Sequence, residues 1–565
     1  MLYAQVIVKK KTQVEELSYS VPARIIPYIR VGSLVSVPLR HKNVKAVVVK
    51  FVRSVPHELK DKIREILSID KKTLPLTEER IRVIEELALK TGSTVAEIAF
   101  HALPTTAKTL QVQPEGQAFR FGMRKVIVIQ GTLCWRCEQY RKLLAKYGEK
   151  RNFVFVFAKG QFADAFKASN ASENGRAIVS TLRDIFAPLN RGDFLVVDQP
   201  YHAGSTFSQR PYLSARQIAA IRGEVEGINV IFGDNLLPIE DYPQVQRGFW
   251  KLLAQKTVLK PLFVSDRRGS RELIMPSVLQ RLEKLIANGE RGLALVMSRG
   301  WAQALVCGEC GYVFTCDNCG RTSSLNAEKL QCRYCATVRD WPKACPKCRS
   351  AILRAVGEGV SQFANLLQKA FPGARVAMLS ADAPEIDLKA DILVATEKIF
   401  SFPDVNFDES FILSADRPLS GAKLGGIGDL LGHALELQAN SKRVSVQTYS
   451  PDHPVWGFAS TGKFNSYYEM GLENRRLLRL PPFGSVITFV GFGRHTESLL
   501  KEATGIGEKL SKVLSNVEIS FAEITDRTGQ NYRAEFTVLL PTRPSPKTLH
   551  LIRAQLPMSW SPRLF

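Results

Sequence analysis

The sequence predicts an α/β protein with two parallel-sheet lobes, a small β-rich N-terminal domain and an α+β C-terminal domain. Two observations predict this fold class. Short apolar runs alternate with helical stretches in two separate blocks, one from about residue 120 and one from about residue 285. A cysteine-rich insertion interrupts the second block. At 565 residues the chain is long enough for several domains, each with its own core.

The first predicted domain, residues 1–105, begins with β-like runs that short polar or Gly/Pro segments separate, which is typical of a small barrel or sheet. These runs cover residues 3–8, 33–40 and 45–52. A helix should follow from Thr77, a suitable N-cap, to Gly92, a suitable residue just beyond a helix end. The Pro/Thr/Gln-rich stretch after it is typical of a linker, which we place at 106–120.

The two lobes follow in order, with the first predicted at 121–260 and the second at 261–304 and 351–455. Their apolar runs are short enough to be strands buried on both faces, with helices on either side of each sheet. In the first lobe these runs are 125–131, 152–158, 176–181, 193–198 and 228–233. In the second they are 292–298, 374–380, 390–396 and 409–415. The insertion covers 305–350, and the C-terminal domain, 456–565, opens with a helix.

The chain carries 77 Lys and Arg against 54 Asp and Glu, a formal net charge of +23 spread along its length. A solvated basic surface is one explanation, but binding to a polyanion is favoured, and nucleic acid is the commonest one in a cell. No apolar run approaches the ~20 residues of a membrane span, and the N-terminus lacks the layout of a signal peptide. We therefore expect a cytoplasmic protein.

The insertion holds eight cysteines, all in CxxC pairs, which is a strong metal-site signal. Twelve residues separate the second pair from the third, enough for a hairpin that brings these two together while the outer pairs close over them. The predicted sites are Cys307, Cys310, Cys345 and Cys348 for the first Zn²⁺, and Cys316, Cys319, Cys332 and Cys335 for the second. Both would be full S₄ sites and hence structural. Reduced thiols, a redox centre or an iron–sulfur cluster are the weaker alternatives.

A further pair, Cys134 and Cys137, has no second CxxC partner, so inert thiols are favoured over a metal or redox site. This pair lies in "KVIVIQGTLCWRCEQYRKLL", a strand–turn–helix unit where a two-lobed NTPase would carry GxxxxGK[ST]. The unit has no glycine-rich loop, no Lys at the helix start and no Ser or Thr for Mg²⁺. The stretch "GFASTGKF" (457–464) spells GxxxxGK, but Phe464 replaces the hydroxyl, and we interpret it as a loop.

Asp198 ends the apolar run "DFLVVD", the position at which nucleotide-driven motors hold Mg²⁺. The next residues, Gln199 and Pro200, can neither accept a proton nor bind the metal as an anion. We therefore interpret Asp198 as a relic and predict no catalytic residue and no confident nucleotide-binding residue.

Several stretches together resemble the PriA (primosomal protein N′) family of bacterial replication-restart helicases over nearly the whole chain. They are "SYSVPARIIPYIRVGSLVSVPLR", "YLSARQIAAIR" (212–222), "MSRGWAQALVCGECG", "SVQTYSPDHPVW" and "ENRRLLRLPPF". The resemblance implies helicase-like (RecA-like) lobes, a 3′-end DNA-binding domain at the N-terminus and two zinc ions. It also implies recognition of stalled forks and loading of the replicative helicase, with primosome proteins, a helicase loader and single-strand binding protein as partners at the nucleoid.

The same resemblance exposes departures from the family's motifs. At the position of the family's phosphate loop this sequence has "GTLCWRC", and at its DEEH box it has Asp198-Gln199-Pro200-Tyr201. The family's coupling motif is replaced by "GDNLLP" (233–238), and its Gly-Thr-Glu motif by "GEGVSQ" (357–362). The stretch "GDLLGHALELQANSKRV" lacks the arginine of the family's last lobe-2 motif. We also expect no winged-helix module between the first domain and lobe 1, because the linker leads straight into lobe 1. Near the N-terminus, Ser18 replaces the Asp of Phe-Asp-Tyr. An arginine finger alone accelerates phosphoryl transfer ~10³–10⁵-fold. Since this arginine is missing together with the phosphate-loop Lys and the Glu of the DEEH box, we expect no helicase activity.

What remains is DNA binding, for which we select exposed cations and two family positions. The candidates are Tyr19, Gly32, Arg40, Lys42, Lys45, Arg475, Arg476 and Arg479. The predicted function is a replication-restart factor that binds forked DNA and loads the replicative helicase. The alternatives are a divergent but active DNA-dependent ATPase and a zinc-ribbon adaptor in transcription or repair.

Overall fold

The computed structural model describes most of the chain. The described residues are all except 1, 9–15, 57–61, 104–125, 161–162, 165, 167–176, 257–258, 271, 298–303, 311, 318–323, 327–328, 332–336, 357–358, 381, 420–424, 521, 529–530, 558 and 565. Among them no helix has the length and apolar character needed to cross a membrane. The predicted linker at 106–120 lies outside the described residues.

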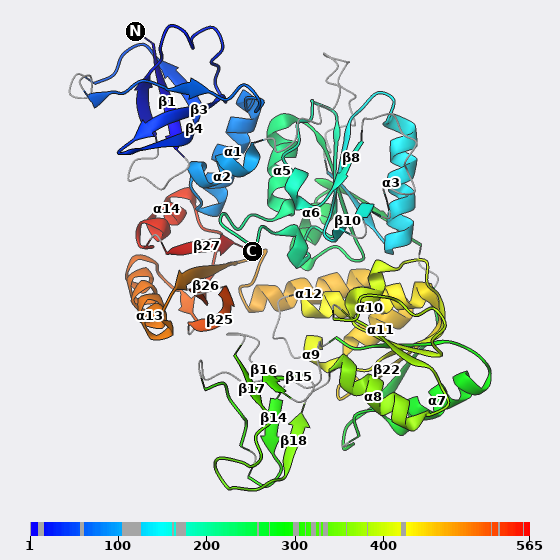
Figure 1. Ribbon diagram of the computed structural model, residues 1–565. Helices are drawn as coiled ribbons and strands as arrows, with labels where there is room; N and C mark the ends of the chain where they lie inside the picture. The colour runs from blue at the N-terminus through cyan, green and yellow to red at the C-terminus, as the bar shows by residue number, and fades with distance from the viewer. Residues whose placement is uncertain are drawn as a thin grey trace.

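The N-terminal domain is an antiparallel sheet in the order β2-β1-β4-β3-β5 (Figure 1). Its strands are β1 (Tyr3–Val8), β2 (Leu17–Ser20), β3 (Leu34–Leu39), β4 (Lys42–Val52) and β5 (Ser68–Ile69). The three β-like runs of the sequence correspond to β1, β3 and β4. Alternate residues of these strands, such as Val6, Val37 and Val48, are fully buried in the core of the domain.

Two helices, α1 (Glu78–Thr91) and α2 (Val95–Ala102), follow this sheet. The helix predicted between Thr77 and Gly92 is confirmed: the Thr77 side chain accepts a hydrogen bond from the Arg80 N–H, and Gly92 ends the helix with φ +69°. Helix α2 was not predicted, although its capping box of Thr94 and Glu97 is visible in the sequence.

Lobe 1 is a six-stranded parallel sheet in the order β11-β6-β10-β9-β7-β8. Its strands are β6 (Val126–Gln130), β7 (Phe153–Phe157), β8 (Ala177–Ser180), β9 (Phe194–Asp198), β10 (Asn229–Asp234) and β11 (Trp250–Ala254), and its helices include α3 (Leu133–Tyr147), α5 (Ala215–Glu226) and α6 (Tyr242–Gln246). Alternate residues of one strand join different cores: Leu195 packs under α5, whereas Phe194 and Val196 pack on the α3 side. Helices therefore cover both faces, as predicted.

Lobe 2 repeats this plan in the order β12-β22-β21-β13-β20-β19. Its strands are β12 (Leu262–Asp266), β13 (Gly292–Leu295), β19 (Val376–Leu379), β20 (Ile392–Ala395), β21 (Phe407–Ile412) and β22 (Ser441–Thr448), and its helices are α7 (Pro276–Ala287), α8 (Val360–Ala370), α9 (Asp416–Leu419), α10 (Gly426–Asn440) and α11 (Pro454–Thr461). The predicted fold class of two parallel-sheet lobes is confirmed.

The loop expected at 457–464 was wrong, because most of this stretch belongs to α11. Pro454 opens the helix, the His453 side chain caps it, and Gly462 ends it with φ +68°. Val455 and Trp456 are buried in the core of lobe 2. The GxxxxGK spelling therefore lies on a packed helix, a context that no phosphate loop has.

The cysteine module projects from lobe 2 as two small antiparallel sheets (Figure 1). The first consists of β14 (Ala304–Cys307) and β18 (Leu353–Val356), and the second of β15 (Ser324–Asn326), β16 (Lys329–Gln331) and β17 (Val338–Asp340). Leu305, Phe314 and Leu330 form its small apolar core. Because this core is small, burial of apolar side chains contributes little to the stability of the module. A metal site would supply the additional stability.

The C-terminal domain begins after α12 (Phe464–Leu477), the helix expected at its start. Its antiparallel sheet has the order β24-β26-β23-β27, with β25 also paired to β26. The elements are β23 (Ser485–Gly493), α13 (Thr496–Val513), β24 (Glu518–Ile519), β25 (Glu523–Thr528), β26 (Asn531–Leu540), α14 (Pro546–Ala554) and β27 (Trp560–Leu564). In Figure 1, α10 and α12 lie between the two lobes.

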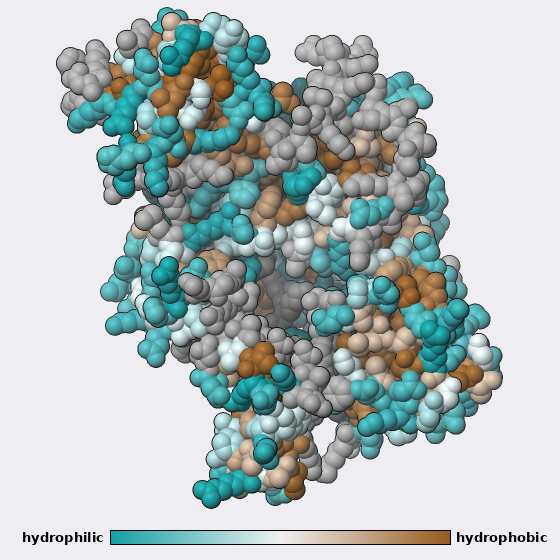
Figure 2. Space-filling view, in the orientation of Figure 1, coloured by the Kyte–Doolittle hydropathy of each residue, from teal (hydrophilic) through white to brown (hydrophobic). Residues whose placement is uncertain are grey.

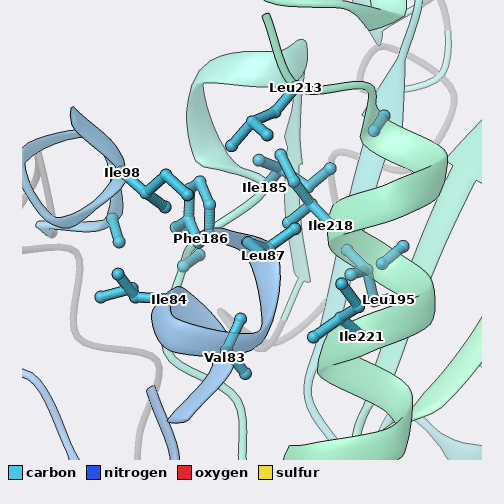
Figure 3. Packing of buried hydrophobic residues seen from close by; sticks show 14 of the residues in the cluster. Val83, Ile84, Leu87, Ile98, Ile185, Phe186, Leu195, Leu213, Ile218 and Ile221 are labelled. Carbon is cyan, nitrogen blue, oxygen red and sulfur yellow. The ribbon is translucent and has the colours of Figure 1, made fainter. Parts of the chain in front are cut away.

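Helices α1 and α2 share one apolar core with lobe 1 instead of a core with their own sheet alone (Figure 3). Ile84 and Leu87 of α1 and Ile98 of α2 face Ile218 of α5 and Phe186 of lobe 1. The N-terminal domain and lobe 1 therefore contact each other directly through α1 and α2. The N-terminal domain is thus fixed to lobe 1 by burial of apolar surface.

A buried ion network lies at the edge of this core. Glu226, the last residue of α5, accepts from Arg80 of α1 at 2.6 Å and from Arg222 at 2.8 Å, and all three side chains are almost completely buried. Both guanidinium groups also donate to backbone carbonyls of residues 185–187. One carboxylate therefore pairs with two buried cations, one from the N-terminal domain and one from lobe 1.

The C-terminal domain contacts the end of α1 and lobe 1. Arg553 of α14 donates to the Gly92 carbonyl at 2.6 Å, and the Gln217 side chain of α5 donates to the Leu564 carbonyl at 3.3 Å. Arg210 of lobe 1 donates to the Ser559 carbonyl. The C-terminal domain thus contacts both α1 and lobe 1 directly.

Candidate functional site

The outer cysteines of the module come together in the structure. The sulfur atoms of Cys307, Cys310, Cys345 and Cys348 all lie within 4.8 Å of one another. The Sγ–Sγ distances are 3.5 Å for Cys307–Cys348 and 3.6 Å for Cys310–Cys345. Zn–S bonds of about 2.3 Å at tetrahedral angles require sulfurs about 3.8 Å apart, so this set fits a Zn²⁺ ion without rearrangement.

The local fold prepares this site for an anion. Backbone N–H groups of Cys310 and Glu309 point at the Cys307 sulfur and lower the pKa of Cys307 to about 6, which favours the thiolate that a metal requires. Of the second predicted set, the structure describes only Cys316, whose side chain is buried. Cys319, Cys332 and Cys335 lie outside the described residues, so the second site stays a prediction.

Replacing Cys345 by serine should lower the zinc content of the purified chain by about one ion, because the hard hydroxyl is a poor substitute for a thiolate ligand. Elemental analysis of the protein after gel filtration measures this. Cys134→Ser is the control and should leave the metal content unchanged. Retention of full zinc by Cys345→Ser contradicts the assignment.

The N-terminal candidates divide into structural and exposed residues. The Tyr19 ring is buried, and its hydroxyl donates to the Pro38 carbonyl at 2.9 Å. Gly32 has φ +85°, and a Cβ there would lie 1.9 Å from the Leu76 carbonyl oxygen. Packing in the core of the N-terminal domain therefore explains the presence of Tyr19, and backbone geometry explains the presence of Gly32.

The three N-terminal cations lie at or near one hairpin. Arg40 occupies the tight turn between β3 and β4 with φ +55°, and Lys42 begins β4. Lys45, further along β4, pairs with Asp70 at 2.9 Å across the sheet, and both side chains are partly exposed. Arg40 and Lys42 project from the surface, where phosphate contacts are open to them.

The tail candidates are not equivalent. Arg475 was wrongly grouped with the exposed cations: its side chain is buried, with 2.9 Å to Glu240 and 2.7 Å to the Pro481 carbonyl. Arg476 and Arg479 are exposed at the end of α12. We retain these two as candidate DNA contacts.

Asp198 is fully engaged by protein groups. At the end of β9 its two carboxylate oxygens accept from Arg136 of α3, at 2.8 Å from Nε and 3.0 Å from Nη2. The Tyr140 hydroxyl donates to the same carboxylate at 2.6 Å. Gly233 permits this approach, since a Cβ there would lie 1.6 Å from the Tyr140 oxygen. A cation from the chain itself therefore occupies the place of a metal ion beside Asp198.

Burial alone would lower the pKa of Arg136, but the adjoining Asp198 carboxylate outweighs it and raises the pKa well above its usual value. The guanidinium also donates to the Gly131 carbonyl and to Asn235 Oδ1. All of these partners are fixed parts of strands or turns. Arg136 is consequently a permanent cation that cannot leave without exposing several buried acceptors.

The start of α3, where a phosphate would bind, is occupied as well. Only Gly131 and Thr132 separate β6 from α3, too few residues for a loop that wraps around a phosphate. The Thr132 N–H donates to Gln255 Oε1 at 2.9 Å. The Leu133 N–H donates at 2.8 Å to Glu436 Oε1, a carboxylate of α10 from lobe 2. Glu436 thus takes the position of an anion at a helix N-terminus and ties the lobes together.

Little space remains at this seam. The cavity beside Gly131, Thr132 and Glu436 has a volume of about 40 Å³, compared with roughly 300–1,000 Å³ for pockets that hold small molecules. Phe464 and Leu435 supply part of its lining. In this arrangement the lobes leave room for a few water molecules and none for a nucleotide.

The seam concentrates carboxylates around one cation. Burial raises the pKa of Asp234, at the end of β10, to about 7, and the negative charges of Asp198 and Asp429 add to this against the opposing Arg136. Burial likewise raises the pKa of Glu436. These groups bind protons more readily in the folded chain than in the unfolded chain.

The sign of the pH dependence follows. A carboxyl group with a raised folded-state pKa contributes stability that is complete below its unfolded value, about 4, and is lost as the pH rises through about 7. Asp234→Asn should therefore reduce the loss of stability between pH 5 and pH 8, as measured by urea unfolding at each pH. An equally steep loss in the variant contradicts this prediction.

The isolated pair at the start of α3 remains a pair of thiols without a described metal partner. Cys134 is exposed and Cys137 partly buried, and burial raises the pKa of Cys137 to about 12, with the Asp198 charge adding to it. Burial also raises the pKa of Cys134. A raised pKa keeps both groups in the thiol form at neutral pH, and the inert interpretation stays a prediction.

The chain is similar in sequence to several known proteins. Residues 5–104 match the family model described as the 3′DNA-binding domain (3′BD) of PriA. "Replication restart protein PriA" of Bacillus subtilis is 24% identical over 446 residues, 73% of this chain and 55% of the relative, and that of Synechocystis sp. is 26% identical over 65% of this chain and 49% of the relative. The protein of the same name from Rickettsia felis is 21% identical over 93% of this chain and 92% of the relative.

The chain is similar to PriA proteins over most of its length, and its N-terminal domain matches a PriA domain. It aligns with about half the length of the Bacillus and Synechocystis relatives and with nearly all of the Rickettsia one. Among solved structures, a variant of S. cerevisiae Dbp5 bound to RNA and ADP BeF3 covers 68% of this chain and 87% of its own length at 12% identity and a TM-score of 0.28. The two six-stranded parallel sheets of this chain agree with the predicted two-lobe α/β fold.

Sequence reasoning missed the two residues that occupy the seam beside Asp198 and the α3 N-terminus, Arg136 and Glu436. Arg136 stands within "CWRC", one turn into the helix where a motif search looks for Lys, so its charge was a visible signal. Glu436 lies 303 residues from its partner Leu133. Nothing in the sequence indicates that contact.

Proposed function

We propose that this chain is a replication-restart protein that binds stalled or abandoned DNA forks and promotes primosome assembly and loading of the replicative helicase, without helicase activity of its own. The observation that carries this proposal is the match of residues 5–104 to the 3′DNA-binding domain. The relatives' name, replication restart protein, and the net charge of +23 support it.

The absence of ATP hydrolysis is proposed from the geometry of the seam. Phosphoryl transfer needs a cradle for phosphate, a metal ion and a water-positioning group. Here the α3 N-terminus binds Glu436, Asp198 binds Arg136, and Gln199 follows Asp198. The helix N-terminus that would hold phosphate and the carboxylate that would hold the metal ion therefore already have partners within the chain.

The remaining parts of the proposal concern organisation and partners. We propose two structural Zn²⁺ ions in the 305–350 module, with the 1–105, 121–260, 261–455 and 456–565 boundaries as functional units. The expected partners are forked or branched DNA, primosome proteins, the replicative helicase or its loader, and single-strand binding protein. We expect the chain to act in the cytoplasm at the nucleoid.

The test measures DNA binding and ATP turnover on the same preparation. We expect tighter binding to a fork with a free 3′ end than to linear duplex of the same length and salt, and ATP hydrolysis at the buffer rate with and without that fork. Fork-stimulated turnover would favour the alternative of an active ATPase. Equal affinity for fork and duplex would favour a zinc-ribbon adaptor.

A further inference from the structure

The C-terminal end of α12 carries the most exposed large apolar side chains among the described residues. Leu477 is 72% and Leu478 67% exposed. They are adjacent in the sequence, with Arg476 before them and Arg479 after them, and both arginines are exposed. Two neighbouring leucines this far from any core bury no surface in the folded chain, so burial does not explain them.

The backbone around these leucines is held firmly. The Leu480 N–H donates to the Arg475 carbonyl at 2.8 Å and the Leu478 N–H to the Asn474 carbonyl at 3.0 Å, which closes the helix end. Buried Arg475 fixes the returning chain through the Pro481 carbonyl. A Cβ at Gly484 would lie 1.9 Å from the Arg479 carbonyl oxygen, so only glycine allows the chain to pass so closely. The leucines therefore project from a rigid turn.

Arg479 occupies the position just beyond the helix with φ +52°. Helices favour glycine there, and a left-handed non-glycine residue costs about 1–2 kcal/mol. The Arg476 guanidinium lies over the Phe483 ring at 5.2 Å, which holds it beside the turn. The left-handed backbone of Arg479 is therefore strained, and this residue is the second cation next to the leucines.

In Figure 1 α12 runs toward the C-terminal domain, below lobe 1. Figure 2 shows this face of the molecule hollowed near its centre. A rigid apolar pair flanked by cations suits a ligand that offers an apolar face between phosphates. The branch point of forked DNA has this chemistry, because its last base pair is stacked on one side only.

We propose that Leu477 and Leu478 form a wedge that packs on the exposed face of the terminal base pair at a DNA branch point, while Arg476 and Arg479 contact the flanking phosphates. This inference rests on the proposed function and adds to it the element that recognises the junction. A continuous duplex offers no such face without unstacking, so the wedge favours forks over linear DNA.

The test compares the wild-type chain with Leu477→Ala/Leu478→Ala on a fork that carries 2-aminopurine at the branch-point pair. Wild type should change the 2-aminopurine fluorescence on binding, and the variant should not. Fork affinity should fall about tenfold, as loss of a buried leucine contact predicts, with linear-duplex affinity changed less than twofold. Leu551→Ala, an exposed leucine of α14, is the matched control and should behave as wild type.

Arg479→Gly provides a second variant that folding cannot confound, because glycine relieves the left-handed strain. It should keep or raise the melting temperature while lowering fork affinity and reducing the salt slope of log K by about one. Equal fork affinity and fluorescence in wild type and the double-alanine variant would overturn the wedge alone. A wild-type chain without fork preference would overturn the proposed function and the wedge together.

Discussion

Replacing Arg136 by alanine should lower the free energy of unfolding by about 3–5 kcal/mol, because it removes the one cation from a buried cluster of carboxylates. Asp198 would lose both guanidinium bonds while remaining inaccessible to water, and Asp234 and Glu436 would lose the positive charge that opposes their burial. Urea unfolding monitored by tryptophan fluorescence measures the effect.

A matched control lies on the same helix. Lys142 of α3 pairs with Glu138 in solvent, and Lys142→Ala should change the stability by less than about 1 kcal/mol. The double change Arg136→Met/Asp198→Leu should recover part of the loss, since it removes the carboxylate that Arg136 pairs with, although Asp234 and Glu436 still lose their cation. If Arg136→Ala proves as mild as Lys142→Ala, the guanidinium does not maintain the seam.

Glu226→Ala should cost a similar ~3–5 kcal/mol, for the opposite reason: it leaves Arg80 and Arg222 buried together with no anion between them. Burial lowers the pKa of Arg222 to about 10, with the Arg80 charge adding to it, even with the carboxylate in place. Limited proteolysis should then cut the N-terminal domain away from lobe 1 at protease concentrations that leave wild type intact.

Glu224 gives the control for this experiment. It lies on the same helix and pairs with Lys90 of α1 across the same interface, but in solvent, with a Nζ–Oε2 distance of 3.2 Å. Glu224→Ala should leave the proteolysis pattern and the unfolding midpoint close to those of wild type. A proteolysis pattern shared by both variants would show that the ion network does not hold the domains together.

The sequence was sufficient for the lobes because their strands are buried on both faces and read as uninterrupted apolar runs, as in Phe194–Asp198. The start of α1 at Thr77 was predictable for the same kind of local reason, a side chain that caps its own helix. Helix α11 was not, because its signal competes with a glycine-containing motif and its helicity depends on burying Trp456 in lobe 2.

The candidate sites divide in the same way. Ligand spacing is local, so the outer cysteine set could be proposed from the chain alone, and the structure brings those four sulfurs together. Arg475 could not be separated from Arg476 by sequence, since only the folded turn shows which of two adjacent arginines reaches Glu240. The carboxylate at the α3 N-terminus comes from another lobe, and no local pattern encodes it.

Helix α1 packs against α14 and β27 as well as against lobe 1, and the hydrogen bond from Arg553 to the Gly92 carbonyl joins residues 461 positions apart in the sequence. The covering of this helix therefore depends on two distant parts of the chain. Truncation near residue 560, which removes β27, should accordingly weaken the packing of α1 beside the N-terminal sheet.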